Sequence, residues 1–197
     1  METEIEAKFL NIEYNSMREK LKKEGAVLVY GERFMRRKNF DYPDWHLEKR
    51  GGWIRVRDEG DRVTLSYKQL NDRTLHGTQE VSVDVSDFDR ACAFLSVIDF
   101  EMKSYQETKR EQWRLNDCDV TIDTWPWIHS FVEIEGLDEA AVRSTAHILD
   151  LDWSLAIHGS VETAYQAEYD VTEQEIDRWK EITFIPIPDW LAAKRKK

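Results

Sequence analysis

Acidic side chains recur two residues apart in two distant segments of this sequence. Glu4 and Glu6 precede Lys8 near the N-terminus, and Glu133 and Glu135 form a second pair. Residues two apart on a β-strand point to the same face, where like charges repel unless cations compensate them. Carboxylate oxygens are the ligands that hard cations such as Mg²⁺ or Mn²⁺ prefer. We therefore interpret both pairs as candidate metal ligands.

Basic side chains follow the same spacing. Arg55 and Arg57 alternate with the apolar Ile54 and Val56, and Lys68 lies in a similar run. Arginine and lysine supply the donors that phosphate oxygens need, so a cavity with both sets of charges suits a metal-bound triphosphate. If the polar strand faces share one cavity, it holds Glu4, Glu6, Glu80, Asp123, Glu133 and Glu135 against Lys8, Arg55, Arg57, Lys68 and Arg110.

The same alternation has a second interpretation. Half-buried strands normally present a polar face of Glu, Lys and Arg to water, and periodicity alone does not separate that case from a binding cavity. Familiar nucleotide motifs are absent: the sequence has no GxxxxGK[ST], GxGxxG or GxSxG. The five histidines have no HExxH spacing, which argues against a zinc site.

Composition sets limits on the class of protein. The 197 residues, 41% hydrophobic and 34% charged, fit a single globular domain over 1–197. The net charge of −11 argues against a nucleic-acid partner, since the only basic run is the tail at 194–197. No apolar run approaches the ~18 residues of a membrane span, and the N-terminus lacks the pattern of a signal peptide. Two cysteines without a CxxC pair add to the expectation of a cytoplasmic protein.

Alternating and helical patterns predict an α+β fold. We expect strands at 3–9, 53–57, 62–69, 79–85, 119–125 and 131–135, with weaker alternation at 36–42 and 105–115. The turn at 58–61 joins two of them as a hairpin. Ser16 and Ser86 are the expected caps of two helices, a third helix covers 137–149, and a fourth begins at Ser160. Thr172 with Glu175 forms the capping box of a fifth.

Several blocks in order resemble the CYTH, or triphosphate tunnel metalloenzyme, family. Residues 4–8 read EIEAK, which matches the ExExK signature, and 53–57 read WIRVR, which is similar to LRxR. LSYK at 65–68, QE at 79–80, KREQW at 109–113, and ID at 122–123 followed by FVEIEG at 131–136 resemble the later blocks. The resemblance covers about 2–170 and leaves a C-terminal helical extension and the basic tail.

This resemblance implies a closed antiparallel eight-stranded β-barrel, the triphosphate tunnel, with helices packed outside. It implies Mg²⁺ or Mn²⁺ as cofactor and a small-molecule triphosphate as partner: ATP, thiamine triphosphate or tripolyphosphate. The implied catalytic and substrate-binding cations are Lys8, Arg55, Arg57, Lys68 and Arg110. The implied metal-side carboxylates are Glu4, Glu6, Glu80, Asp123, Glu133 and Glu135.

Three functions remain open at this point. The first is hydrolysis of the triphosphate. The second is class IV adenylate cyclase chemistry, which gives cyclic AMP and pyrophosphate, and the third is a non-catalytic polyphosphate-binding module. Two positions depart from the family pattern: Thr108 stands where a lysine is frequent, and Ser82 where a second carboxylate is frequent. At Thr108 one phosphate contact is either missing or supplied elsewhere.

Overall fold

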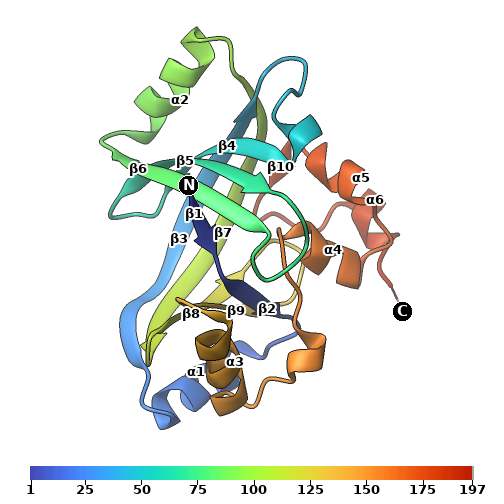
Figure 1. Cartoon of the computed structure of the whole chain (residues 1–197). Coiled ribbons are helices and arrows are strands. Elements are labelled where there is room, and N and C mark those ends of the chain that lie inside the picture. The colour runs from blue at the N-terminus through green and yellow to red at the C-terminus, as the bar shows by residue number, and fades with distance from the viewer. Residues whose placement is uncertain (197) are drawn as a thin grey trace.

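One large antiparallel sheet dominates the computed structural model, which describes residues 1–196 (Figure 1). The strand order is β1-β6-β5-β4-β3-β7-β8-β9-β2, and β10 (Glu181–Ile182) pairs with β7 in parallel outside that order. The bounds are β1 Glu2–Glu4, β2 Glu6–Phe9, β3 Val27–Asp41, β4 Gly52–Asp58, β5 Val63–Leu70, β6 Thr78–Val85, β7 Glu101–Leu115, β8 Cys118–Thr124 and β9 Phe131–Glu135.

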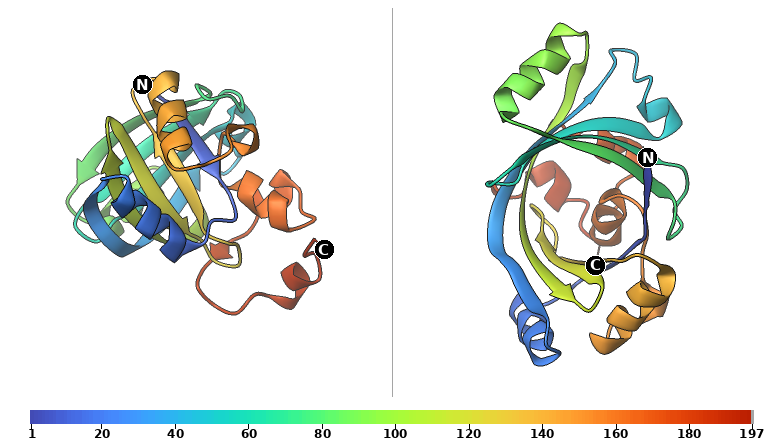
Figure 2. Two further views of the ribbon diagram at one scale, coloured as in Figure 1. Left: turned by 90° about the horizontal axis from the view of Figure 1, so that it is seen from below. Right: turned by 60° about the vertical axis from the view of Figure 1, so that its left-hand side comes forward.

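The two ends of this strand order are consecutive in the sequence. β1 pairs with β6 and β2 pairs with β9, while Ile5 alone separates β1 from β2. The single strand expected at 3–9 is therefore interrupted at Ile5, whose side chain packs against the apolar cluster beneath α1 and α3. In the right-hand view of Figure 2 the strands curve around a common interior.

Within residues 1–196, six helices lie outside the sheet, and the α+β prediction is confirmed. They are α1 Tyr14–Lys23, α2 Phe88–Val97, α3 Glu139–Ile148, α4 Glu162–Glu168, α5 Glu173–Asp177 and α6 Asp189–Ala192, with 3₁₀ turns at Glu48–Arg50 and Trp153–Leu155. Figure 1 shows α1 and α3 at one end of the strands and α2 at the other. None of these helices is long and apolar enough to cross a membrane.

Two of the expected helix caps are wrong. The Glu13 carboxylate, not Ser16, accepts hydrogen bonds from the first free backbone N–H groups of α1, so this helix begins earlier than predicted. Asp87 rather than Ser86 caps α2, because its carboxylate reaches the backbone N–H of Arg90. The capping box of Thr172 at α5 is confirmed.

The strand predictions hold best where one face packs against a helix. Ala7 and Phe9 of β2 are buried with the apolar side chains of α1 and α3, so the alternate residues of β2 point to the other side of the sheet. β3 and β7 are each 15 residues long and exceed the predicted segments 36–42 and 105–115. Their pairing contains register shifts, for example between Tyr30 and Arg33, which break the alternation from which a strand is recognised.

Candidate functional site

The polar strand faces line a cavity of about 340 Å³. Ten predicted site residues contribute to it: Glu4, Glu6, Lys8, Arg55, Arg57, Lys68, Glu80, Arg110, Glu133 and Glu135. The eleventh, Asp123, is not among the lining residues. Its side chain is 0% exposed and lies behind Arg110, whose Nε donates to it over 2.7 Å. Thr121 donates a second 2.7 Å hydrogen bond to the same carboxylate, so Asp123 holds Arg110 in place.

Burial separates the two interpretations of these strand faces. Glu6 is 8% exposed, Lys8 5% and Arg55 7%, whereas a polar face turned to bulk water would leave such side chains largely accessible. These residues therefore face the interior of the sheet rather than the solvent. Glu135 differs, because it lines the cavity but is exposed.

Lys8 bridges two of the carboxylates. Its Nζ donates to Glu6 Oε1 over 2.5 Å and lies 3.3 Å from Glu133 Oε2. Burial alone would lower the pKa of Lys8, but the charges of Glu133 and Glu6 outweigh it and raise the pKa. Burial and the neighbouring Glu133 raise the pKa of Glu6. The Lys8 and Arg110 charges overcome burial and lower the pKa of Glu133.

Lys68 bridges a second pair in the same way. Its Nζ lies 2.9 Å from both carboxylate oxygens of Glu4 and 2.8 Å from Glu80. Burial raises the pKa of Glu4 to about 7, although Lys68 opposes this shift. Despite burial, the hydrogen bond with Glu4 and the charges of Lys68 and Arg55 lower the pKa of Glu80. Each lysine thus lies between one carboxyl group whose raised pKa favours the protonated form and one whose lowered pKa favours the ionised form.

These oxygen-only pairs fit a hard divalent cation. Within residues 1–196 no group of three or more His, Cys, Asp or Glu side chains is arranged to hold a metal ion. Mg²⁺ does not need such a cage, because it commonly takes one or two carboxylates and completes its shell with water and substrate phosphates. The pairs Glu4/Glu80 and Glu6/Glu133 each supply two carboxylates.

Arg37 is a buried cation of the cavity that sequence reasoning missed. It is 6% exposed, and no carboxylate in residues 1–196 lies within ion-pair distance of its guanidinium group. Its Nη2 donates to Thr108 Oγ1 over 2.7 Å, and the guanidinium group lies 4.7 Å from the ring centroid of Trp125. Burial, together with the charges of Arg57 and Arg55, lowers the pKa of Arg37 well below its usual range. The predicted strand at 36–42 contains Arg37, but the sequence alone does not show which face this side chain occupies. The β3–β4 register shows it, because Arg37 lies directly opposite Arg57.

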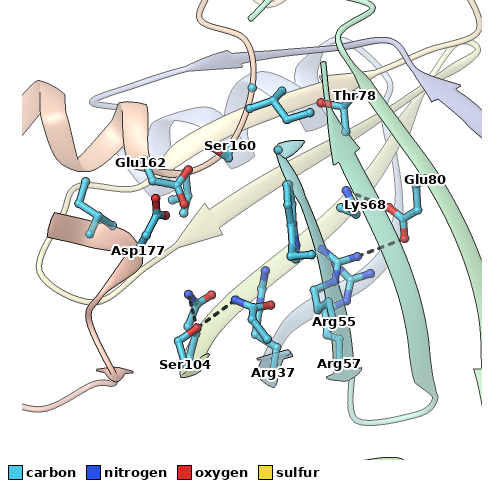
Figure 3. Close-up of a pocket in the computed structure, with 18 of the residues that line it drawn as sticks. Arg37, Arg55, Arg57, Lys68, Thr78, Glu80, Ser104, Ser160, Glu162 and Asp177 are labelled. Atoms are coloured by element: carbon cyan, nitrogen blue, oxygen red, sulfur yellow. Dashed lines mark hydrogen bonds and ion pairs between the residues drawn. The ribbon is translucent and has the colours of Figure 1, made fainter. Parts of the chain in front are cut away.

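Three arginines therefore lie side by side in the cavity, Arg37, Arg55 and Arg57 (Figure 3). Arg55 is 3.3 Å from Glu80, and burial and the charge of Arg57 lower its pKa to about 10. Arg57 donates to Glu59 Oε1 over 2.7 Å, and this buried carboxylate was also missed. The Nε atoms of Arg37 and Arg55 are buried and have no hydrogen-bond partner in residues 1–196.

The interior continues beyond this cavity. A second one, of about 180 Å³, is lined by Tyr30, Glu59, Asp119 and Thr121 among others. It shares Arg57, Arg110, Glu133 and Glu135 with the first. These shared side chains therefore lie between the two cavities.

The two departures from the family pattern have local explanations. Thr108 is 0% exposed and contacts Arg37, so a cation from β3 lies beside the position where a lysine is frequent on β7. Ser82 forms a 2.8 Å hydrogen bond with Ser66 on the neighbouring strand β5. Each position is thus occupied by a neutral hydroxyl that has a hydrogen-bond partner.

The chain belongs to the CYTH domain family, which matches residues 2–152. None of the curated proteins compared with it matches. The fold is similar to that of a candidate adenylate cyclase from Vibrio parahaemolyticus, with a TM-score of 0.72 at 15% identity over 84% of this chain and 98% of that one.

Two further solved structures share the fold. The PH1012 protein from Pyrococcus horikoshii has a TM-score of 0.66 at 19% identity, covering 78% of this chain and 93% of its own. A candidate adenylyl cyclase from Hippeastrum, whose dominant activity is described as triphosphatase, has a TM-score of 0.57 at 11% identity, covering 89% and 95%. At these identities the likeness concerns the fold.

Proposed function

We propose that this protein is a metal-dependent triphosphatase that binds an organic or inorganic triphosphate in the arginine-lined cavity. Membership of the CYTH family supports this proposal. Lys8, Arg55, Arg57, Lys68 and Arg110 hold the phosphate oxygens, and Arg37 joins them. Positioned cations stabilise the charge that builds up on phosphoryl oxygens and on the leaving group during displacement.

A closed barrel is the second part of the proposal. β1 and β2 occupy opposite ends of the strand order yet follow each other in the chain, which supports a sheet that closes on itself through Ile5. Counted as one interrupted strand, they make eight strands with β3 to β9. The whole chain, 1–197, is then one domain in which the cavity runs along the barrel interior.

Mg²⁺ or Mn²⁺ would be held by the carboxylates of the cavity. Glu4 with Glu80 and Glu6 with Glu133 are the pairs that supply the oxygens, and the exposed Glu135 lies beside them. The bound cation would neutralise phosphate charge and orient the attacking water. The chain's own contribution is to fix the phosphates between its arginines and to exclude bulk water from them.

The observation that carries the proposal is the pair of unsatisfied guanidinium Nε groups of Arg37 and Arg55. A buried donor without a partner costs about 1–3 kcal/mol, and more when it is charged. Arginines crowded together lower one another's pKa, as found for both residues. A polyanion placed between them would satisfy the free donors and relieve the repulsion.

Product analysis tests this proposal. The protein is incubated with tripolyphosphate, ATP and thiamine triphosphate in Mg²⁺ and in Mn²⁺, and we expect orthophosphate. Cyclic AMP with pyrophosphate from ATP would instead identify the cyclase, and binding without turnover a binding module.

Arg55→Ala is the matching variant, and we expect it to lower kcat/KM for tripolyphosphate by at least ten-fold. Arg90→Ala is its control, because Arg90 is exposed on α2 and does not line the cavity. Equal turnover by the two variants would contradict the assignment of the cavity as the active site.

A further inference from the structure

The wall of the cavity opposite the arginines carries carboxylates that the triphosphate does not explain. Glu162 at the start of α4 and Asp177 at the end of α5 both line the cavity, as does Glu173. In Figure 3 the side chains of Glu162 and Asp177 lie close together, across the cavity from Arg55, Lys68 and Glu80. On the arginine side the carboxylates are paired with cations, whereas Glu162 and Asp177 have no basic partner within residues 1–196.

The charge of this wall is not compensated by the protein. Glu173 forms a 2.6 Å ion pair with Arg73, but no basic side chain in residues 1–196 lies within ion-pair distance of Glu162 or Asp177. The Oε2 atom of Glu162 is buried and has no hydrogen-bond partner among those residues. Burial raises the pKa of Asp177 to about 7, with Glu162 and Glu48 adding to the effect. Burial also raises the pKa of Glu162. An unpaired buried carboxyl takes up a proton or pairs with a cation, and a positive group supplied from outside would stabilise the charged form of both residues.

The carboxylates of this wall come from the part of the chain that follows the family match. Glu162 and Asp177 follow residue 152, where the match to the CYTH family ends. The family's motif residues bind phosphate, whereas this C-terminal segment brings carboxylates to the same cavity. A ligand that satisfies both sides carries phosphates at one end and a positive charge at the other.

We propose that Glu162 and Asp177 form a specificity site for a positively charged organic group attached to the triphosphate. This inference rests on the proposed function, because the arginines must hold the phosphates for the organic group to reach the acidic wall. A single positive charge against two carboxylates in a partly desolvated site is expected to favour the cationic ligand by ten-fold or more. Inorganic tripolyphosphate, which has no such group, gains nothing from this wall.

The test compares the dissociation constants of three triphosphates by calorimetry at pH 7.5 with Ca²⁺ in place of Mg²⁺, after a check that no orthophosphate is released during the titration. The ligands are thiamine triphosphate, which carries a fixed positive charge, ATP, whose base is neutral, and tripolyphosphate. The unaltered protein should bind the cationic ligand at least ten-fold more tightly than ATP. In Glu162→Gln/Asp177→Asn this advantage should fall below three-fold, while the Kd for tripolyphosphate stays within two-fold.

Asp170→Asn is the matched control, because Asp170 is an exposed carboxylate of the same segment that does not line the cavity. The single variant Asp177→Asn is measured as well, so that poor folding of the double variant does not decide the outcome. The inference would be overturned if both variants kept the preference for the cationic ligand, or if the unaltered protein had no such preference. The proposed function would still stand in either case, provided that the protein binds tripolyphosphate. A failure to bind tripolyphosphate would overturn both.

Discussion

Replacing Arg37 by methionine separates a role in binding from a role in stability. Without ligand, the guanidinium group is buried beside two arginines with Thr108 as its hydrogen-bond partner. The variant loses that charge-assisted hydrogen bond, worth about 1.5–3 kcal/mol, and a cation–π contact of about 0.5–2 kcal/mol. It also removes a buried charge whose desolvation costs several kcal/mol. These contributions nearly cancel, so the free protein should be as stable as before or more stable by up to about 2 kcal/mol.

Triphosphate binding should respond in the opposite direction. Losing one charge-assisted contact of about 1.5–3 kcal/mol weakens binding roughly 10- to 150-fold. Calorimetry with tripolyphosphate and Ca²⁺ in place of Mg²⁺, under conditions in which no orthophosphate is released, measures the Kd, and thermal melts without ligand measure the stability. Arg36→Met is the control, because Arg36 neighbours Arg37 on β3 but forms a 3.1 Å ion pair with Asp58 and does not line the cavity. A Kd within two-fold of the natural protein would refute the assignment of Arg37 to the substrate, and a large loss of stability without ligand would show that the guanidinium group is a structural element.

Three further predictions concern other parts of the cavity. Glu133→Gln/Glu135→Gln should stay folded but lose turnover and the rise in Tm that Mg²⁺ or Mn²⁺ gives the natural protein; a retained metal-dependent rise would contradict the metal assignment. Thr108→Lys should weaken tripolyphosphate binding and destabilise the fold by about 1–3 kcal/mol, because the site is 0% exposed and contacts Arg37. If the phosphate contact is instead missing at this position, the added lysine would tighten binding, and that result would contradict the prediction. Asp177→Asn should raise Tm at pH 8 more than at pH 5. The folded pKa of about 7 exceeds the unfolded value near 4, so the stability that Asp177 contributes is fully present below pH 4 and is lost as the pH rises through 7. A shift of three pKa units corresponds to about 4 kcal/mol at most, and solvent screening at this half-buried side chain reduces it. Equal Tm differences at both pH values would show that this carboxyl is not perturbed.

The sequence predicts the residues of the candidate site more accurately than it predicts where the strands begin and end. Alternation places Lys8 and Arg55 on polar faces, and because helices cover the opposite apolar faces, those polar faces turn inward together. Arg37 escaped the sequence argument because its strand pairs through register shifts, so its alternation is poor and only the partner Arg57 reveals its direction. Asp123 is on the expected face, yet Arg110 lies between it and the cavity, which spacing along a strand does not show.

Glu162 and Asp177 could not be found from spacing at all. They lie at the ends of two short helices, 15 residues apart in the sequence, and only the packing of these helices over the strands brings their carboxylates to one wall. Tertiary packing sets such positions, and a single sequence has no periodicity that marks them.

The pairing of the first nine residues has a consequence for folding during synthesis. Residues 6–9 pair with 132–135, and Lys8 exchanges two backbone hydrogen bonds with Ile157, at 2.9 and 3.0 Å. β2 therefore leaves the ribosome more than a hundred residues before its partners do. Contacts so distant in sequence slow folding and leave strand edges open in the nascent chain. β2 is synthesised before these partners and is among the last strands to be placed, so the sheet is completed only after residue 157 has been made.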